Sequence, residues 1–145
     1  MKKGISGALT ILAGGLIYVF WRRDSLLMFS WFTALGIAPV VDALRAAAAP
    51  VFTVFPSWIY FSLPHGLYLY GGLMCFEALW QGSADLGSRV WPAAFAALTI
   101  GAELGQRWSV IPGQFDWVDL GVLLACVVTF YGRRYFGHRM RGSRA

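Results

Sequence analysis

Four polar side chains that could perform chemistry stand close together in an apolar part of the chain, within the segment GAELGQRWSVIPGQFDWVDLG. They are Glu103, Gln106, Asp116 and Asp119. Carboxylates and amides bind cations and polar headgroups, and a carboxylate removed from water can serve as a general acid or base. His65, in an earlier apolar segment, is the remaining polar group that could join them. These five residues form the predicted binding site.

The spacing of the acidic residues predicts a hairpin of two helices that brings them together. The glutamate and glutamine are three positions apart, so they share one face of a helix. Pro112 and Gly113 follow them and suit the two central positions of a type II turn. The aspartates open the next helix, where Asp116 can cap free amides and Asp119 is favoured by the positive helix end.

Three structural alternatives account for the same residues without a site. Glu103 can form an ion pair with Arg107, one helical turn later. Asp116 can act only as a helix cap. Gly101 and Gly105 have the G-x-x-x-G spacing that lets membrane helices approach closely, so the polar face can be a helix contact. Membrane depth separates these interpretations, since a helix dipole contributes only ~0.3–1 kcal/mol, whereas an acid at the bilayer centre costs ~2.5–3.5 kcal/mol.

The familiar catalytic motifs are missing from the sequence. It has no G-x-S-x-G, no H-E-x-x-H, no phosphate-binding P-loop and no dinucleotide-binding glycine pattern. His65 and the acids lack a recognised metal-ligand spacing, so we expect no metal and no cofactor. Cys75 and Cys126 stand in apolar runs and are predicted to pack against other side chains without forming a disulfide.

The elements that position these residues are predicted from composition. The chain has 145 residues, of which 58% are hydrophobic, 17% aromatic and 13% charged, a balance typical of bilayer proteins. We predict one all-α domain, an integral membrane helical bundle of about four transmembrane helices with an interfacial or re-entrant segment. The predicted spans are residues 5–21, 57–80, 90–108 and 115–132, near the ~20 residues that cross a bilayer.

Two parts of this bundle carry more specific expectations. Residues 25–55 are expected to lie in the membrane surface or to re-enter it, although the chain has five spans if residues 25–41 cross. In the second span, Pro64 removes a backbone donor and Gly66 weakens the helix. We therefore predict a kink or break beside His65.

Positive charge is concentrated at the end of the chain. The net charge is +5, and the basic tail, residues 133–145, holds five arginines and no acid. Because the tail adjoins an apolar helix, it predicts contact with anionic membrane lipids and not with nucleic acid. Four spans place Lys2 and Lys3 on the same side as the tail, so both termini are expected in the cytoplasm.

Residues 1–20 are similar to a secretion signal, but they lack a small-x-small cleavage site, so we expect a retained span.

The order E-x-x-Q, P-G and D-x-x-D resembles the VanZ-like family of small bacterial integral membrane proteins, as does an upstream His followed by Tyr. The matching residues are Glu103, Gln106, Pro112, Gly113, Asp116 and Asp119, with His65, Tyr68 and Tyr70 upstream. The resemblance covers roughly the second half of the chain and implies a multi-pass protein of the bacterial inner membrane. The family's best-known member is linked to reduced glycopeptide susceptibility, and the family has no settled biochemical activity.

The chain also departs from the family pattern. Gln114 stands where the family commonly has Arg, and Pro64 stands where a Lys usually precedes the His. Leu123 and Cys126 replace an Asn and a Gly of the last helix. These departures are typical of a divergent branch, so antibiotic resistance is not part of the prediction.

The leading functional hypothesis is a non-enzymatic membrane protein with a polar pocket at the outer edge of the bundle. The pocket is expected to bind a polar headgroup, a cell-envelope component or precursor, or a membrane partner protein. One alternative is an intramembrane enzyme acting on a lipid-linked substrate, with Glu103 or Asp119 as the acid or base. Another is a purely structural membrane subunit, in which the polar groups only lock the hairpin.

Overall fold

The computed structural model describes residues 2–24, 26–80 and 85–142, and this part of the chain is helical without a strand. The prediction of an all-α fold is therefore confirmed. The elements are α1 (Lys2–Trp21), α2 (Leu27–Ala34), α3 (Ala38–Ala48), the 3₁₀ helix η1 (Ala49–Thr53), α4 (Ser57–Phe61), α5 (Leu63–Leu79), α6 (Leu86–Arg107) and α7 (Trp117–Gly142). The side chains of tail residues 137–145 lie outside the described part.

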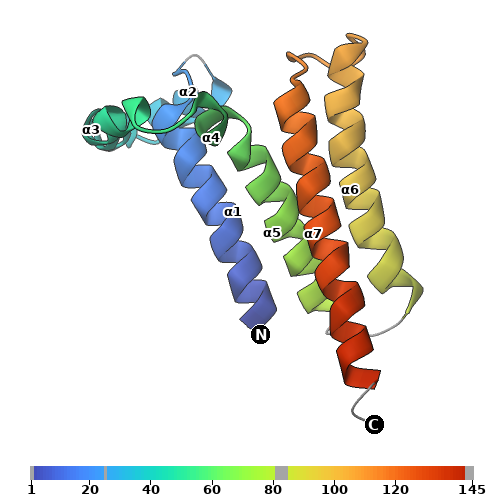
Figure 1. The fold of residues 1–145 in the computed structure, drawn as a ribbon. Coiled ribbons are helices and arrows are strands. Elements are labelled where there is room, and N and C mark those ends of the chain that lie inside the picture. The colour runs from blue at the N-terminus through green and yellow to red at the C-terminus, as the bar shows by residue number, and fades with distance from the viewer. Residues whose placement is uncertain (1, 25, 81–84, 143–145) are drawn as a thin grey trace.

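Four long helices form the body of the molecule, and the short helices lie across one end of it (Figure 1). The upper end of the bundle, as Figure 1 is drawn, carries α2 to α4 and the loop between α6 and α7. The lower end carries the start of α1, the end of α5, the start of α6 and the end of α7. Successive long helices therefore run in opposite directions, and α1 begins at the end of the bundle where α7 finishes.

α5 is the central helix, and glycines allow its neighbours to approach it closely. A Cβ atom on Gly71 would lie 2.7 Å from the carbonyl oxygen of Gly7 in α1. On another side of α5, a Cβ atom on Gly66 would lie 2.4 Å from Cγ1 of Val122 in α7. Contacts through small residues are typical of helices that associate in membranes. The buried cluster beside them contains Leu69, Leu73, Ala96, Leu123 and Phe130.

The predicted second span is divided, but not where we expected. The interruption is at Ser62, between α4 and α5, and Pro64 stands in the first turn of α5. A proline is tolerated there because the first amides of a helix have no intrahelical acceptor. Gly66, expected to weaken the helix, lies within α5 and is buried. The predicted break beside His65 is therefore wrong in position by about one helical turn.

Residues 25–55 form short helices across the upper end (Figure 1). α2 has 8 residues and α3 has 11, which at ~1.5 Å per residue are too short to cross ~30 Å. Arg45 of α3 donates to the carbonyl oxygens of Val19 and, at 2.8 Å, Arg22. Its guanidinium also lies 4.7 Å from the ring centroid of Phe29. Arg45 therefore fastens α3 to the last carbonyls of α1, which have no intrahelical donor.

Within the described residues, one helix is long and apolar enough to cross a membrane by length and composition, Lys3–Trp21. A signal sequence near the N-terminus meets the same two criteria. α5 has only 17 residues, α6 includes Arg89, and α7 includes Asp119 and Arg133. Length and composition therefore leave the expected four membrane-spanning helices unsupported.

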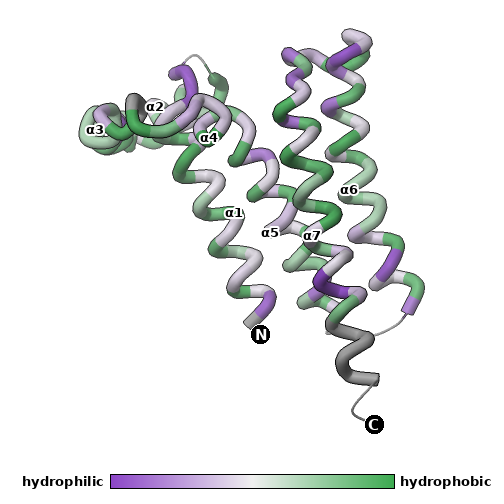
Figure 2. The backbone as a smooth tube through the Cα atoms, in the orientation of Figure 1, coloured by the Kyte–Doolittle hydropathy of each residue, from purple (hydrophilic) through white to green (hydrophobic). Residues whose placement is uncertain are grey.

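Hydrophobic residues nevertheless occur along the whole length of the long helices (Figure 2), and many of their side chains are exposed. Leu98 of α6 is 74% exposed and Val128 of α7 is 71% exposed, while Leu9 and Leu12 are more than half exposed on α1. A soluble monomer rarely leaves large apolar patches open to water. The outer surface of these helices is therefore expected to lie in an apolar environment or against a partner protein.

Candidate functional site

A cavity of about 650 Å³ lies at the upper end of the bundle, where the end of α1 and the start of α5 face the α6–α7 loop. Aromatic side chains from three segments form part of its wall: Tyr18, Phe61 and Phe115. Its polar lining consists of Arg22, Arg23, His65, Gln106, Gln114, Asp116 and Asp119. Four of the five predicted site residues thus line one cavity.

His65 and Asp119 form the central contact of the cavity. Nδ1 of His65 lies 3.2 Å from Oδ2 of Asp119, joining α5 to the first turn of α7. Asp119 is 8% exposed, and the positive end of α7 favours its charge. Its second oxygen, Oδ1, is buried and has no hydrogen-bond partner in the described structure. Because buried acceptors are normally satisfied, this oxygen marks an incomplete polar site.

Glu103 lies beside the cavity and serves a different purpose. It is 6% exposed, and its Oε1 accepts a hydrogen bond of 3.1 Å from the backbone N–H of Asp116. Oδ1 of Asp116 in turn accepts from the N–H of Val118 at 2.8 Å, so Asp116 caps α7. Glu103 therefore holds the start of α7 in place, and it is not among the residues that line the cavity.

Gln106 packs against the turn of the hairpin. A Cβ atom on Gly113 would lie 2.6 Å from Cδ of Gln106, at the flexible end of that side chain, and the φ of Gly113 is one that L side chains rarely adopt. Gly113 has a φ of +148°, far from the ~+80° of a type II turn. The turn at Pro112 and Gly113 is therefore not the predicted type II turn, although Gln106 and the aspartates do line the same cavity.

Two of the structural alternatives are wrong. The carboxylate of Glu103 bonds to the start of α7, and no ion pair with the exposed Arg107 forms among the residues that the structure places. A Cβ atom on Gly101 would meet open space, and one on Gly105 would meet Ile111 of the same hairpin. The G-x-x-x-G spacing therefore makes no contact with another helix in the described bundle.

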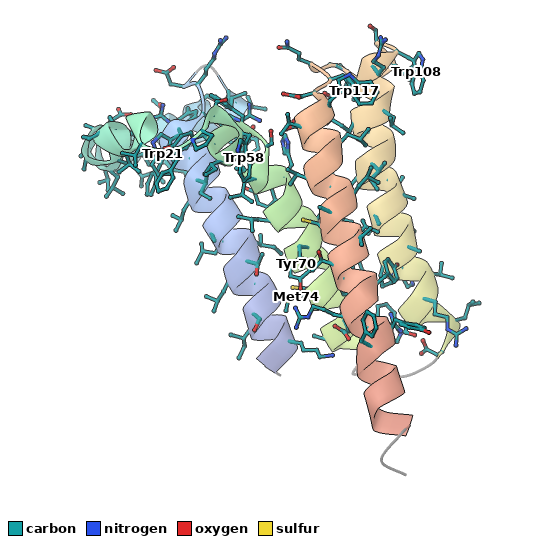
Figure 3. The ribbon with its side chains drawn as sticks, viewed as in Figure 1. Trp21, Trp58, Tyr70, Met74, Trp108 and Trp117 are labelled. Carbon is teal, nitrogen blue, oxygen red and sulfur yellow. The ribbon has the colours of Figure 1, made fainter. Side chains whose placement is uncertain are left out.

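The tyrosines of the family-like pattern lie away from the cavity. Tyr68 faces α1, where its hydroxyl would lie 3.5 Å from a Cβ atom on Gly15. The hydroxyl of Tyr70 accepts a hydrogen bond from Arg133, toward the lower half of the bundle (Figure 3). Neither tyrosine lines the cavity with His65.

Arg22 and Arg23 are cavity residues that sequence reasoning missed. Neither is among the five residues of the predicted binding site. In the structure, the Arg22 guanidinium lies 5.0 Å and 5.5 Å from the ring centroids of Tyr18 and Phe61. Its Nε is buried without a hydrogen-bond partner in the described structure. The order of the helices could have indicated this position. In an antiparallel bundle of four helices, the end of the first helix and the loop between the last two helices lie at the same end of the bundle.

The cavity therefore holds charges of both signs that do not pair with each other. The ion pairs found among the described residues are Lys3–Glu77 at 2.6 Å and His65–Asp119. Arg22 and Arg23, which follow α1, line the same cavity as the aspartates at the start of α7 without meeting them at ion-pair distance. No group of three or more His, Cys, Asp or Glu side chains suited to a metal occurs in the same described set. This arrangement can bind a ligand that presents opposite charges at its two ends.

No family model matches the chain, and neither a curated protein nor a solved structure matches it. The resemblance to the VanZ-like family therefore depends only on the motif residues and stays a prediction.

Proposed function

We propose that the chain is a multi-pass membrane protein of the VanZ-like type, in which α1, α5, α6 and α7 cross the bacterial inner membrane. Tryptophans support this arrangement, because Trp21, Trp58, Trp108 and Trp117 gather at the upper end (Figure 3). Trp80 follows α5 and Trp91 lies near the start of α6, both toward the lower end. Two aromatic belts separated by ~26 Å, the length of α5 at ~1.5 Å per residue, suit a bilayer.

The distribution of basic residues supports an orientation with the lower end in the cytoplasm. Lys3, Arg89, Arg133 and Arg134 belong to the lower ends of their helices. The upper end also carries arginines, namely Arg22, Arg23, Arg45 and Arg107, but the sequence adds Arg139, Arg141 and Arg144 beyond Arg134, so the larger share of the basic residues belongs to the lower end. The positive-inside rule then places both termini in the cytoplasm and the cavity on the outer face.

The cavity is proposed to bind a polar headgroup, a cell-envelope component or a membrane partner protein. One observation carries this proposal: a buried carboxylate, Asp119, has an unsatisfied oxygen in a cavity that also contains Arg22. An unsatisfied buried acceptor costs about 1–3 kcal/mol. A protein that retains such a group gains from a ligand that completes it.

Native mass spectrometry of the detergent-purified full chain tests this proposal. Wild-type protein incubated with a polar extract of bacterial membranes should retain a bound molecule. Asp119→Asn and Arg22→Gln should lose it, because each removes a charge that lines the cavity. Asp42→Asn and Arg107→Gln are matched controls, since both residues are exposed and neither lines the cavity. Equal retention by all four variants would contradict a binding role for the cavity.

The His65–Asp119 contact favours a second candidate, an intramembrane enzyme acting on a lipid-linked substrate. An aspartate that orients a histidine is a common arrangement for a general base. The described residues of the lining include no Ser, Thr or Cys, so among them His65 would activate water and would not assist a protein nucleophile. The enzyme hypothesis requires substrate turnover that is lost in His65→Gln, measured by mass spectrometry of the lipids after incubation. Bound but unchanged lipid favours the binding protein.

A further inference from the structure

We propose that the cavity recognises a zwitterion, a phosphate ester that carries a primary ammonium group, as in phosphoethanolamine. This inference rests on the proposed function, because it names the ligand class of the same cavity. The charges of the lining, the unsatisfied atoms and the occupied aromatic faces each restrict the ligand.

The first restriction is that the ligand must carry both charges. A simple anion attracted to Arg22 and Arg23 would also face Asp116 and Asp119 across the same cavity, and a simple cation would face the arginines. Because the arginines and aspartates form no ion pair with each other in the described structure, neither set is neutralised by the other. A ligand with an anionic and a cationic end satisfies both sets at once.

The anionic end belongs with Arg22 and Arg23, the arginines that follow α1. Guanidinium groups bind phosphate through paired N–H donors, and a phosphate has enough oxygens for two arginines. The hydrogen-bond donors of Arg22 are incompletely satisfied. Its Nε is buried without a partner in the described structure, and its Nη2 makes only a long contact of 3.4 Å to the carbonyl oxygen of Phe61. Arg23 is exposed at the mouth of the same cavity.

The cationic end belongs with the aspartates, and it must be able to donate hydrogen bonds. Oδ2 of Asp119 is engaged by His65, but Oδ1 lacks a donor although Asp119 is only 8% exposed. Asp116 uses Oδ1 to cap α7, which leaves Oδ2 for a ligand. A primary ammonium has three N–H donors, whereas a quaternary ammonium has none.

The aromatic wall supports the same choice. Quaternary ammonium ligands are usually recognised by stacks of aromatic rings around the cation. Two of the three rings in this cavity, Tyr18 and Phe61, already lie against the guanidinium of Arg22. Phe115 pairs with Trp117 at 4.9 Å between ring centroids. Each ring therefore already contacts another side chain of the protein. The carboxylates of Asp116 and Asp119 are the partners that we assign to the cation.

The experiment compares short-chain lipids that differ only in the headgroup, added to the full chain purified in a maltoside detergent. The probes are dihexanoyl phosphatidylethanolamine, its trimethylated analogue phosphatidylcholine, and phosphatidylglycerol, which has the phosphate without an ammonium. Binding is measured by isothermal titration. We expect phosphatidylethanolamine to bind at least tenfold more tightly than either of the others. Glycerophosphoethanolamine, without acyl chains, shows whether a soluble zwitterion is enough or a lipid is required.

Variants test whether the carboxylate of Asp119 causes the preference for phosphatidylethanolamine. Asp119→Asn should bind phosphatidylethanolamine as weakly as phosphatidylcholine, while Arg107→Gln should keep the wild-type preference. Equal binding of the two lipids by the wild-type protein overturns the inference even if no variant folds. If the cavity binds phosphatidylglycerol or phosphatidylcholine best, and Arg22→Gln abolishes that binding, the headgroup pocket stands and the phosphate ester with a primary ammonium does not. If no headgroup binding depends on Arg22 or Asp119, both proposals fail.

Discussion

Glu103 and Asp119 are both buried acids of the α6–α7 hairpin, yet their partners give them different roles. Glu103 accepts from the backbone N–H of Asp116, so removing it frees the start of α7. Asp119 has one oxygen on His65 and the other without a partner in the described structure. A hydrogen bond from a buried side chain to the backbone stabilises the fold. A buried site residue with an unsatisfied oxygen often lowers stability instead.

The first prediction follows from this contrast. Glu103→Ala should lower the free energy of unfolding by about 1–3 kcal/mol, the range for losing a hydrogen bond to a charged group. Glu103→Gln should lose less, because its amide oxygen can still accept from Asp116. Asp119→Asn should leave stability nearly unchanged. Thermal unfolding in detergent, followed by far-ultraviolet circular dichroism, measures all three. A larger loss for Asp119→Asn than for Glu103→Ala would reverse the assigned roles.

At the scale of single elements, the end of α6 determines how the hairpin begins. Ser109 has a φ of +56°, in the left-handed region that an L residue rarely adopts. The N–H groups of Ser109 and Val110 donate to the carbonyls of Gln106 and Gly105, at 3.1 Å and 2.9 Å. This is the hydrogen-bond pattern of a Schellman cap, in which glycine usually occupies the left-handed position.

Ser109→Gly should therefore stabilise the protein. Relief of left-handed strain is worth about 1–2 kcal/mol, and the greater freedom of glycine in the unfolded chain offsets about half of that. The expected gain is about 0.5–1 kcal/mol, seen as a higher unfolding temperature. Ser109→Ala keeps the strained backbone and serves as the matched control, with no gain expected. A gain from alanine as large as that from glycine would mean that backbone strain is not the cause.

The contact between α1 and α5 depends on the absence of side chains at the crossing. Gly71→Ala places a Cβ atom 2.7 Å from the backbone oxygen of Gly7 and 2.7 Å from Cγ1 of Ile11. We expect a loss of about 1–3 kcal/mol, the usual range for overpacking. Gly101→Ala is the control, because its Cβ atom meets open space and alanine favours a helix. Unfolding temperatures of the two variants should move in opposite directions, and a neutral Gly71→Ala would contradict the close crossing.

The sequence predicted the hairpin better than it predicted the cavity. Pro112, Gly113 and the cap at Asp116 are local signals, because each residue acts on backbone a few positions away. The presence of Arg22 in the cavity depends on how α1 packs against α5, which no local pattern encodes. The same limit applies to Glu103, since a helix face can be read from spacing but the amide that it meets cannot.

At the scale of the whole molecule, two interpretations of the hydrophobic content compete. In one, only Lys3–Trp21 enters the membrane, as an anchor or a signal sequence, and the remaining helices lie on one side. In the other, all four long helices cross. The exposed apolar side chains of α6 and α7, such as Leu98 and Val128, favour the second, because a domain in water would bury them. In the first interpretation, the lower and upper ends of α6 and α7 lie on the same side of the membrane. In the second, they lie on opposite sides.

Cysteine labelling from one side of the membrane decides between them. Gln114→Cys reports the upper end and Leu86→Cys the lower end, and both positions are exposed. Neither substitution changes the charge that directs insertion, and Cys75→Ala with Cys126→Ala provides the background without other thiols. In intact cells, a maleimide that cannot cross the membrane should label Gln114→Cys, and Leu86→Cys should react only after permeabilisation. If both cysteines behave alike, α6 does not cross the membrane and the cavity is not on the outer face. The apolar surface of α6 and α7 would then face water unless a protein partner or the membrane surface covered it.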